Sequence, residues 1–173
     1  MLTCPSLLAQ AAGFSGQTII STAADRPTDV YAADLNGDGF PDVLSASFSD
    51  DKLAWYPNLG GGVFGAQQVI STSANQPRSV FAADLDGDGD GDKDVLSASH
   101  DDKIVWHENL GGGNFGPQQI ISTQVVAARS VDCADFDGDG QLDVMAIGSG
   151  GFDKLGWFRN LGGGAVGPLQ ASE

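Results

Sequence analysis

The chain has 173 residues, with 23 Asp and Glu against 8 Lys and Arg and a formal net charge of −15. Only Glu108 and Glu173 are glutamate, so nearly every acidic residue is aspartate, which favours turns, caps and metal loops over helix interiors. With 25 Gly and 7 Pro as well, the composition argues against a helical protein. The negative field opposes nucleic acid and anionic membranes, and no apolar run approaches the roughly 20 residues that span a bilayer. We therefore expect no nucleic-acid partner and no membrane insertion.

Residues 1–13 form an N-terminal segment outside the pattern that follows. The segment contains Ala-Gln-Ala-Ala, as a signal-peptide cleavage site would, but it lacks a basic start and a long apolar stretch. Cys4 lies here and Cys133 lies in an apolar strand pattern, so the two cysteines predict no disulfide framework. Residues 14–22 are a stray copy of an outer strand that recurs at 64–72 and 115–123.

A repeat of about 51 residues organises the rest of the chain, over residues 23–72, 73–123 and 124–173. Trp55, Trp106 and Trp157 mark its period, and each is followed by Asn-Leu-Gly-Gly-Gly. Four apolar runs separated by Gly, Asp and Asn turns indicate four strands per repeat, in the second repeat at 79–85, 94–99, 103–108 and 115–122. The fold class predicted is all-β, a β-propeller whose blades are four antiparallel strands. A solenoid of stacked sheets is the structural alternative.

An aspartate-rich loop follows the first predicted strand of every repeat. In the first and third repeats it reads Asp-x-Asp/Asn-x-Asp-Gly-x-x-Asp, beginning at Asp34 and Asp135. Side chains at positions 1, 3 and 5 can converge on one hard cation, Gly at 6 permits a sharp turn, the carbonyl at 7 turns inward, and Asp at 9 completes an oxygen shell. Such donors suit calcium better than zinc. We expect about one Ca²⁺ per repeat in a structural role, and solvated Asp/Gly turns are the alternative.

The second loop, residues 84–94, is two residues longer and fits the pattern in two registers. A start at Asp84 keeps the junction with the preceding strand, whereas a start at Asp86 aligns Asp94 with the last aspartate of the other loops. The second register is slightly favoured because an extra Asp-Gly pair can bulge at the start of the loop. Both registers remain open.

The recurring Ala-Asp-Leu-Asp-Gly-Asp-Gly, Asp-Val-Leu, Trp, Asn-x-Gly-Gly-Gly and Phe-Gly strings resemble the FG-GAP and VCBS repeats of integrin-α-like β-propellers, over about residues 14–170. The resemblance implies calcium in the hairpin of each blade, an extracellular or cell-surface location, and a role in adhesion or ligand binding, in some members of carbohydrate. The metal ligands that it implies, with all aspartates of the longer second loop as candidates, are Asp34, Asn36, Asp38, Phe40 through its carbonyl, Asp42, Asp84, Asp86, Asp88, Asp90, Asp92, Asp94, Asp135, Asp137, Asp139, Gln141 through its carbonyl, and Asp143.

Three blades are fewer than the four to eight that close a propeller, and open edges favour association. We expect a homo-oligomer, preferably a head-to-tail dimer that closes a six-bladed ring. Residues 14–22 would latch this ring by pairing between chains. A trimer, or a fragment of a longer protein, is the alternative.

The function favoured is a calcium-stabilised, non-catalytic binding module with a glycan ligand, as in a lectin, or a protein ligand in adhesion. A purely structural or protein-interaction propeller is the alternative. A hydrolase or lyase is disfavoured because the polar positions recur in all repeats and neither His100 nor His107 has a nucleophile partner. The candidate ligand-contact residues are Asp50, Asp51, Trp55, Tyr56, Asp101, Asp102, Trp106, His107, Asp153 and Trp157. For the Trp residues, packing between blades is the competing interpretation, and for the Asp-Asp-Lys turns it is a solvated hairpin.

Overall fold

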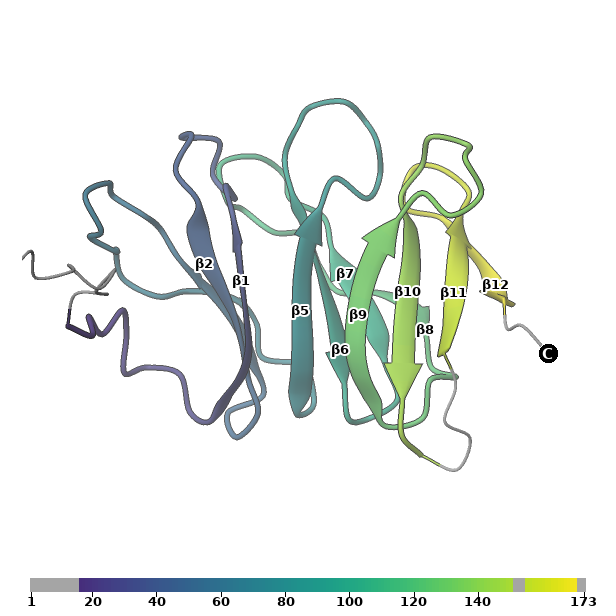
Figure 1. Ribbon diagram of the computed structural model, residues 1–173, viewed down its shortest axis with the longest axis horizontal. Coiled ribbons are helices and arrows are strands. Elements are labelled where there is room, and N and C mark those ends of the chain that lie inside the picture. The colour runs from purple at the N-terminus through teal and green to yellow at the C-terminus, as the bar shows by residue number, and fades with distance from the viewer. Residues whose placement is uncertain (1–15, 151–154, 171–173) are drawn as a thin grey trace, which may run out of the picture.

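The computed structural model describes residues 16–150 and 155–170, which form three four-stranded antiparallel sheets (Figure 1). The first sheet contains β1 (Pro27–Ala33), β2 (Asp42–Ser47), β3 (Lys52–Tyr56) and β4 (Gln68–Ser71). The second contains β5 (Pro77–Ala83), β6 (Asp94–Ser99), β7 (Ile104–His107) and β8 (Gln119–Ser122). The third contains β9 (Ala128–Ala134), β10 (Asp143–Gly148), β11 (Leu155–Asn160) and β12 (Val166–Gln170). The predicted all-β fold, with one blade of four strands per repeat, is confirmed.

Each blade has the same strand register, which carries the loops into equivalent positions. The first hairpin closes on Ala33 opposite Asp42, Ala83 opposite Asp94, and Ala134 opposite Asp143 in the three blades respectively. Side chains alternate between the two faces of a strand, so every second position on the inner strands points toward the following blade. Among the described residues, no helix is long and apolar enough to cross a membrane.

Two hydrophobic cores lie between the blades. Leu44, Leu53 and Trp55 of the first blade pack with Val80 and Val95 of the second. The equivalent positions of the second blade pack in the same way against the third. Burying each such aliphatic side chain contributes about 1.5–3 kcal/mol, so the contact between blades is a main source of stability. Strands β1, β5 and β9 stand side by side along the molecule, and the three sheets form an open row that does not close into a ring (Figure 1).

The stray strand predicted at 14–22 is not a strand where the structure describes it, at residues 16–22. Ile20 instead lines a shallow hollow on the outer face of the first blade, beside Val30 and Tyr56. The fourth position of the third sheet belongs to β12, so a latch from another chain would have to extend or displace that strand. The latch between chains stays a prediction.

Candidate metal centres

The three aspartate-rich loops connect the first and second strand of each blade and lie at one edge of the molecule, at the top of Figure 1. In the first loop, Asp34 accepts hydrogen bonds from the backbone N–H groups of Gly37 at 2.8 Å and Gly39 at 2.7 Å. The two glycines have φ of 77° and 86°, a backbone conformation that residues with a side chain rarely adopt. Asn36 and Asp38 each accept the N–H two residues ahead. These bonds curl the backbone around the acidic side chains.

The last aspartate of each loop is buried and joins two turns. Asp42 accepts the Leu35 N–H at 3.0 Å with one carboxylate oxygen and the Asn58 N–H at 2.8 Å with the other. Asp94 and Asp143 make the same pair of bonds in their blades. The side chain of the last aspartate therefore fixes the loop to the glycine-rich turn after the third strand. A carboxylate oxygen has further lone pairs, so these bonds do not exclude a cation.

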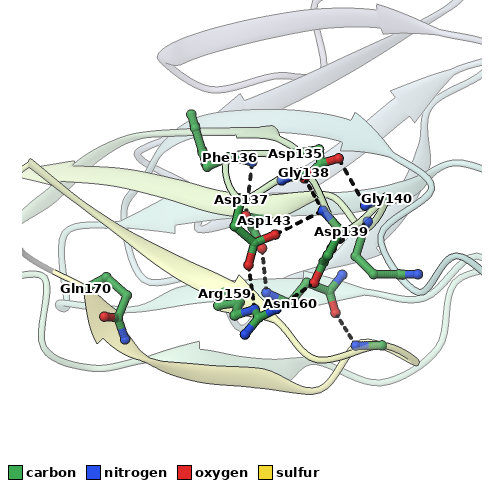
Figure 2. Close-up of polar contacts among 12 residues, drawn as sticks. Asp135, Phe136, Asp137, Gly138, Asp139, Gly140, Asp143, Arg159, Asn160 and Gln170 are labelled. Atoms are coloured by element: carbon green, nitrogen blue, oxygen red, sulfur yellow. Dashed lines mark hydrogen bonds and ion pairs between the residues drawn. The ribbon is translucent and has the colours of Figure 1, made fainter.

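The third loop follows the first and adds an ion pair (Figure 2). Asp135 accepts the Gly138 N–H at 2.7 Å and the Gly140 N–H at 3.0 Å. Arg159 places its Nε 2.6 Å from Asp137 Oδ2 and its Nη2 3.0 Å from Asp139 Oδ2. The first two blades carry Pro57 and Glu108 at this strand position, so only the third loop has a guanidinium against its carboxylates.

The second loop settles the register that the sequence left open. Asp84 accepts the Gly87 N–H at 2.9 Å, as Asp34 and Asp135 do in their loops, so Asp84 takes the first position. Asp94 takes the last position. The favoured start at Asp86 is not supported. The two extra residues form an additional hydrogen-bonded turn in the middle of the loop, where the Asp92 N–H donates to Asp90. The bulge lies inside the loop because both ends are held by backbone hydrogen bonds.

Some carboxyl groups of the loops have raised pKa values, mainly because of burial and further because of neighbouring carboxylates. Burial raises the pKa of Asp94 from 3.8 to about 6 against the opposing effect of its backbone hydrogen bonds. Burial likewise raises the pKa of Asp42 and Asp86, and neighbouring carboxylates raise both further. In contrast, the Gln141 N–H and the Arg159 side chain lower the pKa of Asp139. A positive charge is thus favourable at these loops.

The donor set fits a hard divalent cation. In the second loop, oxygens of Asp84, Asp86 and Asp88 lie within 4.8 Å of one another, and in the third loop one oxygen each of Asp135, Asp137 and Asp143 does so. All of these donors are oxygens, as calcium prefers. Phe40 and Gln141 occupy the seventh position of their loops, where a carbonyl ligand is predicted. Asp90 and Asp92 belong to the additional turn of the longer second loop.

A set of asparagines that the sequence analysis treated only as turn residues ties these loops to the next blade. The side-chain amide of Asn109 donates to the Leu35 carbonyl of the preceding blade at 2.9 Å. Asn160 donates to the Leu85 carbonyl in the same way. The recurrence of Asn at the start of each Asn-Leu-Gly-Gly-Gly string was the available signal, but its partner lies about 75 residues away, where sequence spacing is uninformative.

The predicted ligand-contact residues are largely used between blades. Trp55 is 6% exposed and Trp106 3%, and each ring fills the space above a glycine of the next blade, Gly113 or Gly164. Tyr56 and His107 are buried as well. Burial leaves Trp55, Trp106 and His107 with no face open to a sugar, and it supports the competing packing interpretation for the two tryptophans. Tyr56 is 3% exposed and lines only the shallow hollow beside Ile20 and Val30.

The aspartate turns also have structural partners. Asp51 accepts the Gln76 N–H at 2.9 Å and Asp102 accepts the Ala127 N–H at 2.7 Å, which joins each turn to the segment leading into the next blade. The adjacent Asp50 and Asp101 pair with Lys52 and Lys103 respectively. These four aspartates therefore organise hairpins and blade junctions.

Trp157 differs from the other two tryptophans. It is partly exposed and lines a cavity of about 340 Å³ with Phe136, Leu155 and Gln170. The Phe136 ring lies 5.8 Å from it, centroid to centroid. Asp153, the remaining candidate, lies outside the described residues.

The pattern of the FG-GAP-like repeat matches three segments, residues 9–45, 34–92 and 88–146. The chain belongs to the FG-GAP-like repeat family. None of the curated proteins matches it.

Two solved structures share the fold of this FG-GAP repeat protein. One is a lectin from Agrocybe aegerita that specifically recognises non-reducing terminal N-acetylglucosamine, with a TM-score of 0.61 and 24% identity over 83% of this chain and 37% of the lectin chain. The other is the Tc holotoxin pore of Photorhabdus luminescens, with a TM-score of 0.50 and 23% identity over 79% of this chain and 6% of the pore chain. This chain thus spans little more than a third of the first and a small part of the second.

Proposed function

We propose that this FG-GAP repeat protein is a calcium-stabilised, non-catalytic binding module that acts outside the cell, with carbohydrate as its leading ligand class. The observation that carries the proposal is the convergence of carboxylate oxygens in repeated loops, within 4.8 Å of one another in the second and third. A bound Ca²⁺ would supply positive charge between these carboxylates. The chain itself fixes the shape of each loop, because Asp42 and its equivalents hold the loop against the glycine-rich turn.

Carbohydrate is favoured by exposed aromatic rings beside the oxygen-rich loops. Phe40 is 49% exposed in the first loop and Phe136 is 47% exposed in the third. Apolar ring faces next to a few polar groups are the common chemistry of small-ligand sites. The shared fold with a lectin agrees with this choice but does not carry it. A non-catalytic role is favoured at Cys133, because burial raises the pKa of its thiol to about 12, and at His107, because its ring is buried at 2% exposure away from solvent.

A protein-interaction scaffold is the second candidate, and one observation favours it. Four of the predicted sugar contacts, Trp55, Tyr56, Trp106 and His107, are enclosed. Asp51 and Asp102 bond to the next blade. With these residues engaged in packing or backbone hydrogen bonds, the aromatic surface that remains for a glycan consists mainly of Trp157 and the exposed rings at the loop edge.

Two measurements test the proposal. Calorimetric titration with calcium should show about one ion per blade, and the variant Asp38→Ala with Asp139→Ala should lower both the stoichiometry and the calcium-dependent gain in melting temperature. Asp25→Ala, an exposed aspartate outside the loops, is the matched control and should change neither. Absence of calcium binding by the wild-type chain would overturn the calcium part.

A glycan array read with and without EDTA tests the ligand class. Calcium-dependent hits that weaken in Phe40→Ala but persist in Leu59→Ala, an exposed apolar residue of the nearby turn, would support the carbohydrate proposal. Calcium binding with a blank array would favour the protein-interaction scaffold.

A further inference from the structure

The two internal junctions between blades are copies of one another. In each, the forward face of one blade, which carries the tryptophan, packs on the backward face of the next. The Trp55 ring occupies the place where a Cβ would stand on Gly113, and Trp106 does the same above Gly164. The backward face contributes a valine from its first strand, Val80 or Val131, which is 3% or 4% exposed.

Over residues 16–150 and 155–170, the same two faces at the ends of the row pack against no other blade, and of the described residues before the first blade, Ile20 lies beside Val30. On the third blade, Leu155 occupies the position of Leu53 and Ile104; those two are fully buried, whereas Leu155 is 62% exposed. On the first blade, Val30 takes the position of Val80 and Val131 and is 65% exposed. Each end face thus keeps the apolar side chains of an interface in positions where the internal copies of the same side chains are buried.

The polar contacts of the junction are also present at both ends. All three asparagines donate to a carbonyl of their own loop. Asn109 and Asn160 also donate to a loop carbonyl of the preceding blade, whereas Asn58 has no preceding blade in the described residues. The carbonyl that corresponds to Leu35 and Leu85 in the third blade belongs to Phe136. The amide of Asn58 keeps a second N–H that could make the bond across a junction, so a forward face that offers the Phe136 carbonyl and a backward face that offers this N–H are complementary.

We propose that a second copy of this chain binds head to tail, so that the forward face of the third blade in one copy meets the backward face of the first blade in the other. Trp157 of one copy then lies above Gly62 of the other, where the structure leaves open space, and Asn58 reaches the Phe136 carbonyl across the junction. The occupant is a second copy because the two end faces carry apolar residues at the same strand positions that pack together at both internal junctions. Two such junctions close a ring of six blades, within the four to eight blades of closed propellers.

The first test is the mass of the full chain in solution. Native mass spectrometry and light scattering at about 10 μM should give twice the 17.8 kDa of one chain. A stable monomer would overturn the proposal, and a trimer or an open polymer would overturn closure by two copies. The result does not depend on the function proposed above, because calcium and glycan binding are measured separately.

Paired variants then locate the interface. Leu155→Asp alters the forward face, and Leu110→Asp is its control, since Leu110 is 63% exposed although its blade has neighbours on both sides. Val30→Asp alters the backward face, and Val69→Asp, 54% exposed on the outer strand, is its control. Because all four positions are exposed in the single chain, each variant should keep the far-UV circular dichroism of the wild type.

Head-to-tail binding uses both faces at every junction, so each face variant alone should weaken the dimer roughly 100-fold, as loss of a central interface contact does. The two controls should remain dimers. If only one face variant dissociates, the contact is face to equivalent face and the head-to-tail arrangement is wrong. An equimolar mixture of the two face variants restores one intact junction and should form a heterodimer more tightly than either variant forms a homodimer.

Discussion

Replacing Asp94 with alanine tests whether the last aspartate of each loop is a structural fastener independent of any metal. Its carboxylate is 2% exposed and accepts the Leu85 N–H at 2.9 Å and the Asn109 N–H at 2.8 Å. Alanine leaves two buried donors without a partner, at about 1–3 kcal/mol each. The variant also removes the unfavourable burial of a negative charge, which is the reason that the pKa of Asp94 lies at about 6. The two donors together would cost about 2–6 kcal/mol, and we therefore expect a net loss in the lower half of that range, about 3 kcal/mol at neutral pH.

The matched control is Asp88→Ala in the same loop. Asp88 is exposed and accepts only the Asp90 N–H, and exposed substitutions of this kind usually change stability by about 0.5 kcal/mol or less. In EDTA, the melting temperature of Asp94→Ala should fall by roughly 6–12 °C, since a chain of this size shifts by about 2–4 °C per kcal/mol. Asp88→Ala should melt close to the wild type under the same conditions.

The assay is thermal unfolding followed by tryptophan fluorescence, at one protein concentration and with EDTA present throughout. The three tryptophans lie one per blade, on β3, β7 and β11, so the signal reports all three blades. Equal losses in the two variants, or a loss below about 1 kcal/mol for Asp94→Ala, would show that the loop is held by something other than this buried carboxylate. Added calcium should separate the loss of a buried hydrogen-bond acceptor from the loss of a metal ligand, because it should raise the melting temperature of the wild type more than that of Asp88→Ala.

Three further substitutions probe the blades. Burial holds the pKa of His107 below its ordinary 6.5, so the unfolded chain takes up a proton first and stability should fall as the pH drops below about 6.5. His107→Phe introduces the residue found at the equivalent Phe158. This variant should lose less stability than the wild type between pH 7.5 and 5.5 in urea titrations. Arg159→Gln removes the guanidinium that competes for two carboxylates of the third loop, and calorimetry should show calcium bound roughly two- to five-fold more tightly there. Asn109→Ala leaves a buried carbonyl of the preceding blade unpaired and should cost about 1–3 kcal/mol in urea unfolding. The control Asn114→Ala, at an exposed position, should change stability little. Unchanged stability in Asn109→Ala would show that this bond does not stabilise the junction between blades.

The strands were predictable because their information is local. Alternating apolar residues between glycine and aspartate turns placed β6 at 94–99, as observed. The last strand of the same blade was predicted over 115–122 but spans Gln119–Ser122. Phe115 makes only an isolated bridge to Asn109, and Gly116 closes the turn by donating to Glu108. The apolar pattern continues through this turn although the ladder does not, so the pattern overestimates the strand.

The role of the tryptophans was not decidable from one repeat viewed alone. The same side chain at the same register is buried in Trp55 and Trp106 and partly exposed in Trp157. What differs is the presence of a following blade, which is a property of the arrangement and not of the local sequence. The hydrogen-bond partners of the turn aspartates were not predictable for the same reason, since the N–H groups that Asp51 and Asp102 accept lie 25 residues further along, in the segment leading into the next blade.

The preference for aspartate over glutamate follows from what each loop carboxylate has to do. One oxygen of Asp38 accepts the N–H of Phe40, two residues ahead, and Asp139 does the same for Gln141. A side chain with a single methylene closes this turn, and Asp and Asn are the residues that form it. The second oxygen of the same carboxylate stays available to a cation or, in the third loop, to Arg159. The longer glutamate side chain would loosen the backbone turn that brings the other carboxylates together. The negative charge of the chain is therefore concentrated in aspartates because the residues that shape the loop and the residues that would bind the cation are the same.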